Sequence, residues 1–322
     1  MLDAGVLTTI QDLGRRNAAR WGVSPSGAAD WFSARVANRL VGNSDGAPLL
    51  EITLTGAAFL LEADARLAIT GASAPVAAGG APLAPWTSHD VRAGEKIAVG
   101  RAIRGLRSYV AFDGGIAVPP VMGSASTDLG GGFGGLGGRR LEEGDGFPLG
   151  PKSVAPAHHL ALEASAIPAW PASVTLAATV GPDADWLEPA LQRRLHDVEY
   201  RVSAASTRQA VRLESGAPEI AGSTGIVSTG VVSGCVQISS AGLPMVLLCE
   251  HQTTGGYATA LCVITADLPR AAQLRPGDSV RFSRVGYGEA AEALDASVRK
   301  LGRLREVGGD ARLSAGFSEG LT

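Results

Sequence analysis

Hydrophobic and polar residues alternate in short runs along most of this chain, and glycine or proline bounds many of the runs. The segment "LLEITLTGAAFLLEADARLAITGA" (residues 49–72) predicts three strands, broken at Gly56 and at the acidic turn 62–64. Segments 89–100, 140–150 and 272–285 share a second plan, in which glycine and an acidic residue precede a short alternating run. That plan predicts a tight turn leading into a strand.

Helices are expected at only a few places. Residues 30–43 carry apolar side chains at helical spacing, and Asp30 is a suitable N-terminal cap. A weaker helix is predicted over 183–195 and a third over 288–307, followed by a loose tail. The expected fold is therefore mainly β, with a few short helices.

The chain has 322 residues, which suits two domains better than one. The turn-plus-strand plan recurs in both halves and fits two related β-barrel units, although such turns are also common in unrelated proteins. We expect a first unit over 1–150 and a linker rich in alanine and proline over 151–173. A second unit over 174–287 and a C-terminal helix with a loose tail over 288–322 complete the predicted organisation.

Charge and cysteine content narrow the functional classes. The formal net charge is -3, and the arginines are spread along the chain, so neither a nucleic-acid partner nor a membrane surface is expected. No apolar run approaches the roughly 20 residues of a membrane span, and the N-terminus does not resemble a signal peptide. The three cysteines lie in apolar segments without the spacing of a zinc site. We therefore expect a cytoplasmic protein with packed thiols and no metal.

The first polar segment of interest is "TTIQDLGRRNAARWGVSPSGAAD" (residues 8–30). Gln11, Asp12, Arg15 and Ser26 lie in or beside a predicted loop that ends at the helix start. Such a loop presents free backbone N–H groups, which favour an anion. The alternative is structural: Ser26 or Asp30 caps the helix, and Asp12 pairs with Arg15 at the surface.

The second segment lies between two apolar runs near the end of the second unit. It contains, in order, Glu250, His251, Gln252, Thr253, Thr254, Gly255, Gly256 and Tyr257. The threonines offer hydroxyl groups, and the glycines offer unshielded amides for a carboxylate, phosphate or oxyanion. His251 is a candidate acid or base. The alternative for His251 is a surface position on an edge strand.

A third segment, residues 121–145, has seven glycines between positions 130 and 138. It lacks the G-x-x-x-x-G-K-[ST] phosphate loop, so a lid, an interface loop or plain flexibility remain the interpretations. The chain also lacks a G-x-S-x-G elbow and a Met-Lys-Met biotin-attachment signal. No covalently bound cofactor is therefore expected.

Several blocks in order identify the chain as a member of a known family. They are "LTTIQDLGR" (7–15), "GVSPSGAAD" (22–30), "ANRLVGN" (37–43), "LEITLTG" (50–56), "LAITGA" (67–72), "FDGGIAVPPVMGSAST" (112–127), "HQTTGGY" (251–257) and "ITADLPRAAQLRPGD" (264–278). They resemble the biotin-dependent carboxyltransferase family, also called allophanate hydrolase subunit 2 or the KipA family. That family includes the C subunit of the bacterial ATP-dependent 5-oxoprolinase.

The resemblance implies cyclophilin-like β-barrel units and a partner of the subunit-1 or KipI type, which is the B subunit of 5-oxoprolinase. An A subunit of the LamB/YcsF type completes that enzyme, whose complex opens the cyclic amide of 5-oxoproline to glutamate at the expense of ATP. A second implied activity is carboxyl transfer from carboxybiotin to a urea-like amide. A third is a non-catalytic one, in which the protein antagonises a KipI-type inhibitor of a histidine kinase.

The chemistry of lactam hydrolysis suggests roles for the two polar segments. Gly255 and Gly256 would donate amides, with Thr253 and Thr254 as hydroxyl partners, and Arg15 would hold the substrate carboxylate. Asp12 or His251 would transfer protons, while Gln11, Ser26, Gln252 and Tyr257 would line the substrate site. We expect both segments to share a cleft between the units; the alternative is that they form the surface that docks the partner protein. Residues 16–20 and Glu250–His251 depart from the family pattern, which leaves substrate choice open.

Overall fold

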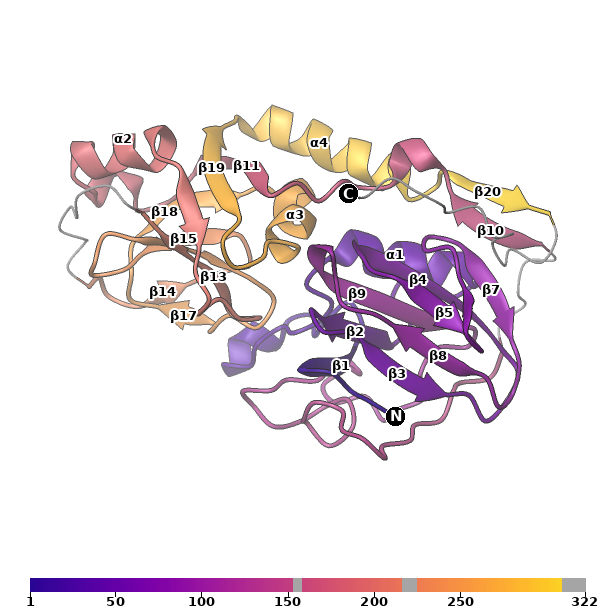
Figure 1. The fold of residues 1–322 in the computed structure, drawn as a ribbon. Coiled ribbons are helices and arrows are strands. Elements are labelled where there is room, and N and C mark those ends of the chain that lie inside the picture. The colour runs from indigo at the N-terminus through magenta and orange to yellow at the C-terminus, as the bar shows by residue number, and fades with distance from the viewer. Residues whose placement is uncertain (153–157, 216–224, 309–322) are drawn as a thin grey trace.

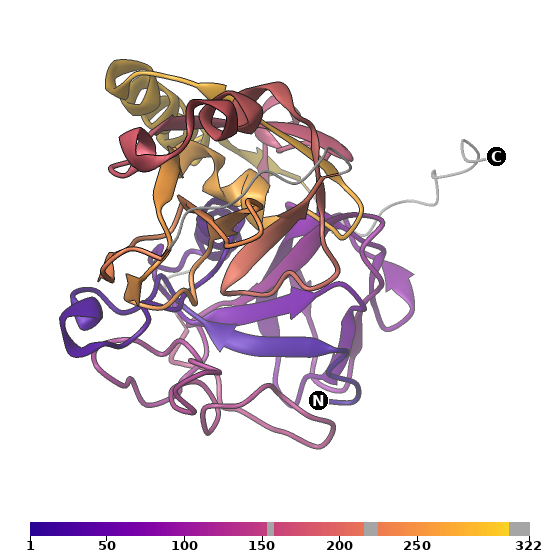
Figure 2. The same cartoon turned by 90° about the vertical axis from the view of Figure 1, so that its left-hand side faces the viewer.

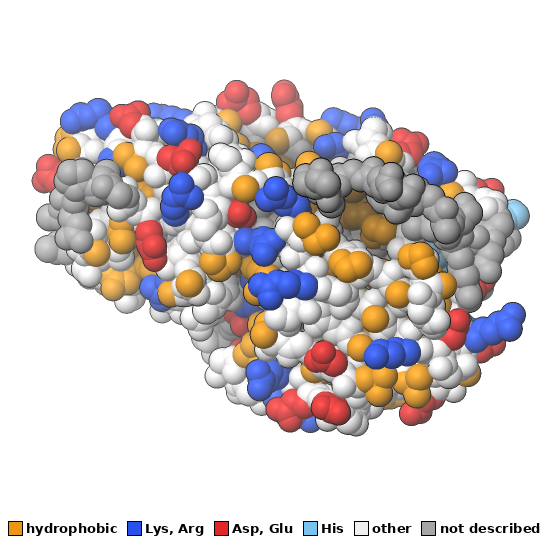
Figure 3. All heavy atoms as spheres, in the orientation of Figure 1, with side chains coloured by type: hydrophobic (Ala, Val, Ile, Leu, Met, Phe, Trp, Pro, Cys, Tyr) orange, Lys and Arg blue, Asp and Glu red, His pale blue; other side chains and the backbone are white. Residues whose placement is uncertain are grey.

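The computed structural model describes residues 1–152, 158–215 and 225–308. Two β-rich halves lie side by side, and the long helix α4 (Tyr287–Lys300) runs across both of them (Figure 1). No helix among the described residues is long and apolar enough to cross a membrane. Acidic and basic side chains are interspersed over the face drawn in Figure 3.

Two sheets enclose one apolar core in the first half. The larger sheet has the order β1 (Leu7–Gln11), β2 (Leu49–Thr53), β9 (Arg104–Phe112), β4 (Ala65–Ser73), β7 (Ser88–Val91), and the smaller has the order β3 (Ala57–Leu60), β8 (Lys96–Val99), β5 (Val76–Ala78), β6 (Ala81–Pro82). Leu67, Ile97 and Phe112 are among the fully buried side chains between them. The three strands predicted over 49–72 are confirmed.

Helix α1 (Trp31–Leu40) covers the other face of the larger sheet, as its apolar stripe requires. Asp30 caps it as predicted, because its Oδ1 accepts a hydrogen bond from Ser33 N at 2.9 Å. The segment between β9 and residue 150, magenta to pink in Figures 1 and 2, runs along the underside of this half without a named strand. The strand predicted within 140–150 is therefore wrong; only an isolated bridge from Ile116 to Leu149 forms there.

The second half is a closed seven-stranded barrel. Its order is β11 (Ser173–Val180), β18 (Thr259–Val263), β15 (Cys235–Ile238), β16 (Pro244–Leu247), β13 (Ala210–Glu214), β12 (Tyr200–Val202), β19 (Ser279–Arg284), and β19 closes on β11 in parallel. A separate ribbon pairs β14 (Thr229–Gly230) with β17 (Thr254–Gly255). The strands expected over 89–100 and 272–285 are present, and the mainly β prediction is confirmed.

Short helices occupy the connections. These are η1 (Ala18–Trp21), η2 (Ala164–Ala166), η3 (Ala184–Trp186), η4 (Thr265–Asp267), α2 (Pro189–Asp197) and α3 (Leu268–Ala272). The helix predicted over 183–195 is thus η3 followed by α2. The predicted 288–307 helix is too long, because α4 ends at Lys300 and the chain continues as a strand.

That last strand, β20 (Leu304–Val307), pairs antiparallel with β10 (His159–Leu162) above the first half. Leu301 and Leu162 are buried there against Phe32 of α1. The C-terminal segment therefore leaves the barrel and packs on the first half, so the chain crosses the junction twice. The division at 151–173 stays a prediction, although this segment contributes β10, and residues 309–322 of the expected tail lie outside the described residues.

Candidate functional site

The two polar segments singled out in the sequence meet at the junction of the halves. Ser24 Oγ donates to the carbonyl oxygen of Cys249 at 3.1 Å, and Arg208 Nη2 donates to the carbonyl oxygen of Gly27 at 2.8 Å. Glu250 is close enough to Arg15 to act on its pKa. The end of the 8–30 segment thus contacts Cys249, which directly precedes the 250–257 segment, and Arg208, which binds Glu250.

Arg15 is almost fully buried, with its guanidinium 4.7 Å from the centroid of the Phe133 ring. Its Nε donates to the Val121 carbonyl at 3.2 Å and its Nη2 to the Ser126 carbonyl, so it braces the segment that precedes the glycine-rich stretch. Burial lowers the pKa of Arg15, while Asp128, Asp12 and Glu250 act to raise it. Among the described residues, no partner accepts from its Nη1. A buried guanidinium with one nitrogen that lacks a hydrogen-bond partner is suited to an anionic ligand.

Ser26 lies next to this arginine. The backbone N–H of Arg15 donates to the Pro25 carbonyl at 2.7 Å, and Gly14 allows no side chain, because an added Cβ would lie 2.8 Å from the carbonyl oxygens of Pro25 and Ser26. Ser26 has a positive φ of 52° and a buried Oγ without a hydrogen-bond partner in the described part of the chain. Ser26 Oγ and Arg15 Nη1 are thus two unsatisfied polar atoms on residues whose backbones lie side by side. Ser26 does not cap α1, since Asp30 does.

Asp12 and Gln11 hold the loop in place. The Asp12 carboxylate accepts from Gly14 N, Ala125 N and the hydroxyls of Ser124 and Ser126 at 2.6–2.7 Å. Gln11 is fully buried; it donates to Thr9 and Thr127 and accepts from Gly27 N at 3.1 Å. The surface pairing of Asp12 with Arg15 is not observed. Both residues fix the backbone on which Arg15 and Ser26 sit.

Sequence reasoning missed the ionic cluster that joins the halves. Arg208 Nε donates to Glu250 at 2.9 Å and its Nη1 to Glu51 Oε1, while Arg107 Nε lies 3.6 Å from the same Glu51 oxygen. All four side chains are at least nine-tenths buried. A charged residue inside the apolar run "LLEITL" was the available signal for Glu51, because buried charges require partners.

A network of hydrogen bonds extends this ionic cluster. The Tyr109 hydroxyl donates to Glu51 Oε2 and accepts from Asp30 N, both at 2.8 Å. Gln273, from α3's C-terminal end, donates to Asp30 Oδ2 at 2.8 Å and to the Arg107 carbonyl at 2.9 Å. Burial raises the pKa of Asp30 and that of Tyr109. The network fixes how the halves sit against each other.

His251 is buried, so a surface position for it is wrong. Burial lowers its pKa, with a smaller opposite contribution from the hydrogen bond to Gln252. Its Nδ1 lies 2.6 Å from the Gln252 carbonyl oxygen, and because a carbonyl only accepts, the proton resides on Nδ1. Nε2 of the neutral ring is then the basic nitrogen.

Residues 252–257 continue as a ribbon in which Gln252, Thr254 and Tyr257 are exposed and Gly255 is buried. Thr254 and Gly255 form β17, and Gly255 packs so closely on Gln237 that an added Cβ would lie 2.4 Å from Gln237 Nε2. Gln237 donates to the Tyr257 carbonyl at 3.1 Å and accepts from Gln252 at 3.4 Å. The ribbon carries Thr254 and Tyr257 on the surface, while the Thr253 carbonyl accepts from Val231 N.

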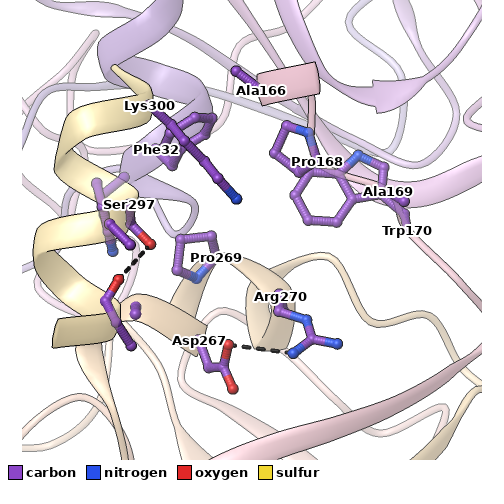
Figure 4. A pocket seen from close by; sticks show the side chains of 14 residues that line it. Phe32, Ala166, Pro168, Ala169, Trp170, Asp267, Pro269, Arg270, Ser297 and Lys300 are labelled. Carbon is purple, nitrogen blue, oxygen red and sulfur yellow. Dashed lines mark hydrogen bonds and ion pairs between the residues drawn. The ribbon is translucent and has the colours of Figure 1, made fainter. Parts of the chain in front are cut away.

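A separate cavity of about 430 Å³ lies between α1, η2, α3 and α4. Figure 4 shows Phe32, Pro168 and Trp170 around it, with Lys300 and Arg270 reaching toward its open space. None of the residues predicted for the site lines this cavity. In the described ranges 1–152, 158–215 and 225–308, no three His, Cys, Asp or Glu side chains gather into a metal site.

A two-sheet unit joined to a closed barrel, with polar loops from both at the junction, defines a two-subdomain β protein. The family model for the carboxyltransferase domain, subdomain A and B, matches residues 21–284. The chain is 37% identical to the 5-oxoprolinase C subunit of Escherichia coli (strain K12) over 295 residues, 91% of this chain and 93% of that protein. For the 5-oxoprolinase C subunit of Haemophilus influenzae the identity is 31%, covering 95% and 97%.

The crystal structure of the K. lactis urea amidolyase superposes with a TM-score of 0.87 at 28% identity, covering 97% of this chain and 20% of that chain. The chain thus spans about a fifth of that larger enzyme and nearly the whole length of the two bacterial proteins. It belongs to the carboxyltransferase family, as the sequence blocks indicated.

Proposed function

We propose that this chain is the C-type subunit of an ATP-dependent 5-oxoprolinase, acting with B-type and A-type subunits in the cytoplasm. The observation that carries the proposal is the nearly end-to-end match with two bacterial 5-oxoprolinase C subunits. The unsatisfied Arg15 Nη1 and Ser26 Oγ support it, because 5-oxoproline has one carboxylate that needs a cation and a hydroxyl.

In this proposal, Arg15 Nη1 and Ser26 Oγ bind the substrate carboxylate at the junction. An amide is a poor electrophile, so ATP transfers its γ-phosphoryl group to the lactam oxygen and ADP leaves. Water then adds to the ring carbon, the ring C–N bond breaks with the proton going to the amine, and a second water releases phosphate to leave glutamate. Amides of Gly255 and Gly256 and the hydroxyls of Thr253 and Thr254 stabilise the charge that develops on oxygen. Gln252 and Tyr257 complete the substrate-facing ribbon.

His251 is better suited than Asp12 to move the proton. The neutral ring has an unprotonated Nε2, whereas the Asp12 oxygens already accept four hydrogen bonds from the loop. Asp12 therefore acts as a positioning residue for Arg15. His251 accepts the proton of the attacking water.

The primary test mixes the chain with its B-type and A-type partners and follows ATP-dependent glutamate release from 5-oxoproline. Release that requires all three chains is the expected result. Arg15→Met should raise KM or reduce kcat/KM by about 10- to 100-fold, since one charge-assisted hydrogen bond contributes roughly 1.5–3 kcal/mol. Arg16→Met is the matched control, because Arg16 is the exposed neighbour.

Thr254→Val separates chemistry from docking. Thr254 is exposed on β17, so the variant should fold normally. Lost activity in a complex that still assembles supports a catalytic ribbon, whereas lost assembly makes the ribbon a docking surface.

Carboxyl transfer is the second candidate, favoured by the superposition on the K. lactis urea amidolyase. An assembled complex that releases no glutamate, but transfers carboxyl from carboxybiotin to a urea-like amide, would replace the lactamase proposal. Assembly without either reaction would favour the antagonist of a KipI-type kinase inhibitor.

A further inference from the structure

Two of the three cysteines face each other across neighbouring barrel strands. Strands β15 and β18 are antiparallel, and their register places Cys235 directly opposite Cys262. Directly opposed residues in such a pair have Cα atoms about 4.5–5.5 Å apart. Disulfides need a Cα separation of about 4.4–6.8 Å, so the backbone already meets this requirement.

Both side chains point away from the main barrel core. Val236 and Leu261, their neighbours, belong to that core, whereas Cys235 and Cys262 pack with Val231 in a small outer cluster. Cys235 is buried and Cys262 is partly exposed. A small molecule can therefore approach the pair from solvent through Cys262.

The two thiols differ in acidity. A hydrogen bond from Cys262 lowers the pKa of Cys235 to about 6, and contacts with Val232 N and Thr259 act in the same direction. The same interaction raises the pKa of Cys262. The hydrogen bond between the two thiols therefore favours the thiolate at Cys235 and the thiol at Cys262, which is the arrangement of a nucleophile beside a resolving cysteine.

We propose that Cys235 and Cys262 are a reversible redox pair, which a peroxide converts into a disulfide between β15 and β18. The Cys235 sulfur attacks one peroxide oxygen, the O–O bond breaks, and hydroxide leaves as a sulfenic acid forms. The Cys262 sulfur then displaces the hydroxyl from that sulfenic acid. With the protons counted, two thiols and hydrogen peroxide give one disulfide and two waters, and a small thiol reverses the change.

The disulfide would form beside the candidate site. Gln237 follows Cys235 by two residues on β15 and holds the Tyr257 carbonyl and Gln252. Because alternate residues of a strand share a face, Gln237 and Cys235 lie on the same side of the barrel. Oxidation would therefore tie together the two strands whose ends support the 251–257 ribbon.

Cys249 provides an internal control. It is buried against Ala29 and Ala272, and burial raises its pKa. It lies at the junction of the halves, and it belongs to a different buried cluster from the other two cysteines. A peroxide that reacts preferentially with thiolates should therefore leave Cys249 unmodified.

The test treats the reduced full-length chain with a small excess of hydrogen peroxide, alkylates the remaining thiols after denaturation, and measures intact mass and cross-linked peptides. The expected product has lost two hydrogen atoms, carries one alkyl group instead of three, and contains a Cys235–Cys262 peptide link that dithiothreitol removes. Cys262→Ser and Cys235→Ser should abolish the link, whereas Cys249→Ser should retain it. Stepwise oxygen addition without a link, or three alkyl groups after treatment, would overturn the proposal.

Discussion

Two buried arginines at the junction, Arg208 and Arg15, use their guanidinium groups in different ways. Arg208 donates through Nε, Nη1 and Nη2 to Glu250, Glu51 and the Gly27 carbonyl. Arg15 donates only to two backbone carbonyls and keeps Nη1 without a partner among the described residues. The two arginines lie in the same region of the molecule. Each guanidinium nitrogen of Arg208 has a hydrogen-bond partner, whereas Nη1 of Arg15 has none among the described residues.

The pKa values of the two arginines are shifted in opposite directions. Burial acts to lower the pKa of Arg208, but Cys249 and Glu250 outweigh it and the pKa is raised. Burial prevails at Arg15, and its pKa is lowered. A buried cation whose N–H groups are all paired within the protein maintains structure. A buried cation with an N–H group that lacks a partner can still bind a ligand. Mutation of Arg208 should therefore reduce mainly the stability of the protein, and mutation of Arg15 should reduce mainly its activity.

Arg208→Met should produce the largest loss of stability. It leaves Glu51 and Glu250 buried without their main cation, which costs about 3–5 kcal/mol in the free energy of unfolding. Urea denaturation measures this loss, and Arg212→Met, at an exposed position on β13, is the matched control. A loss no larger than that of the control would mean that the ionic cluster does not join the halves.

Arg15→Met should cost less stability and more activity. The Val121 and Ser126 carbonyls lose a donor, for which about 1–3 kcal/mol is expected. Urea denaturation of this variant beside Arg208→Met ranks the two losses, and glutamate release by the assembled complex ranks the two activities. If Arg15→Met and Arg208→Met lost the same activity and the same stability, the two arginines would not differ in role.

Sequence patterns drew attention to Arg15 but not to Arg208. The "QDLGR" block drew attention to Arg15, and hydrophobic periodicity located the strands and α1, because local patterns report local structure. Arg208 pairs with a residue 157 positions away, and no local pattern encodes that contact. The same limit explains β20, whose partner β10 lies far upstream, so that its residues resembled the end of a helix.

Burial was also beyond local patterns for the polar residues. Gln11 and His251 lie beside predicted loops in the sequence, yet both are buried. Gln11 ends β1 and is bonded to Thr127 and Gly27, which are remote in the sequence. The glycine-rich segment was found, but its contact with Arg15 was not: an added Cβ at Gly134 would clash with Arg15 Nη2.

Tyr109→Phe tests the hydrogen-bond network at the junction, with a smaller expected effect. Its hydroxyl joins Asp30 N to Glu51, and deletion removes the acceptor of Asp30 N and one of the donors to Glu51 Oε2, which keeps Ala29 N, at a cost of about 1–3 kcal/mol. The ring remains, so packing is preserved. Tyr200→Phe, whose hydroxyl donates to the Arg194 carbonyl inside the barrel, is the control for loss of one hydrogen bond away from the junction. An effect at Tyr109 smaller than that at Tyr200 would contradict the role of the network.

The smallest expected effect concerns pH and His251. The folded protein disfavours the imidazolium, since burial lowers the pKa of His251, whereas the unfolded chain takes up the proton near about pH 6.5. This contribution to stability is complete above that pH and is lost as the pH falls through it toward the lowered folded value. His251→Gln removes the titration, so the wild type should lose stability relative to the variant between about pH 7.5 and about pH 5.5. Urea denaturation of both proteins at the two pH values measures this change. A difference that stays constant, or that favours the wild type in acid, would show that burial does not lower the pKa of His251 in the folded protein.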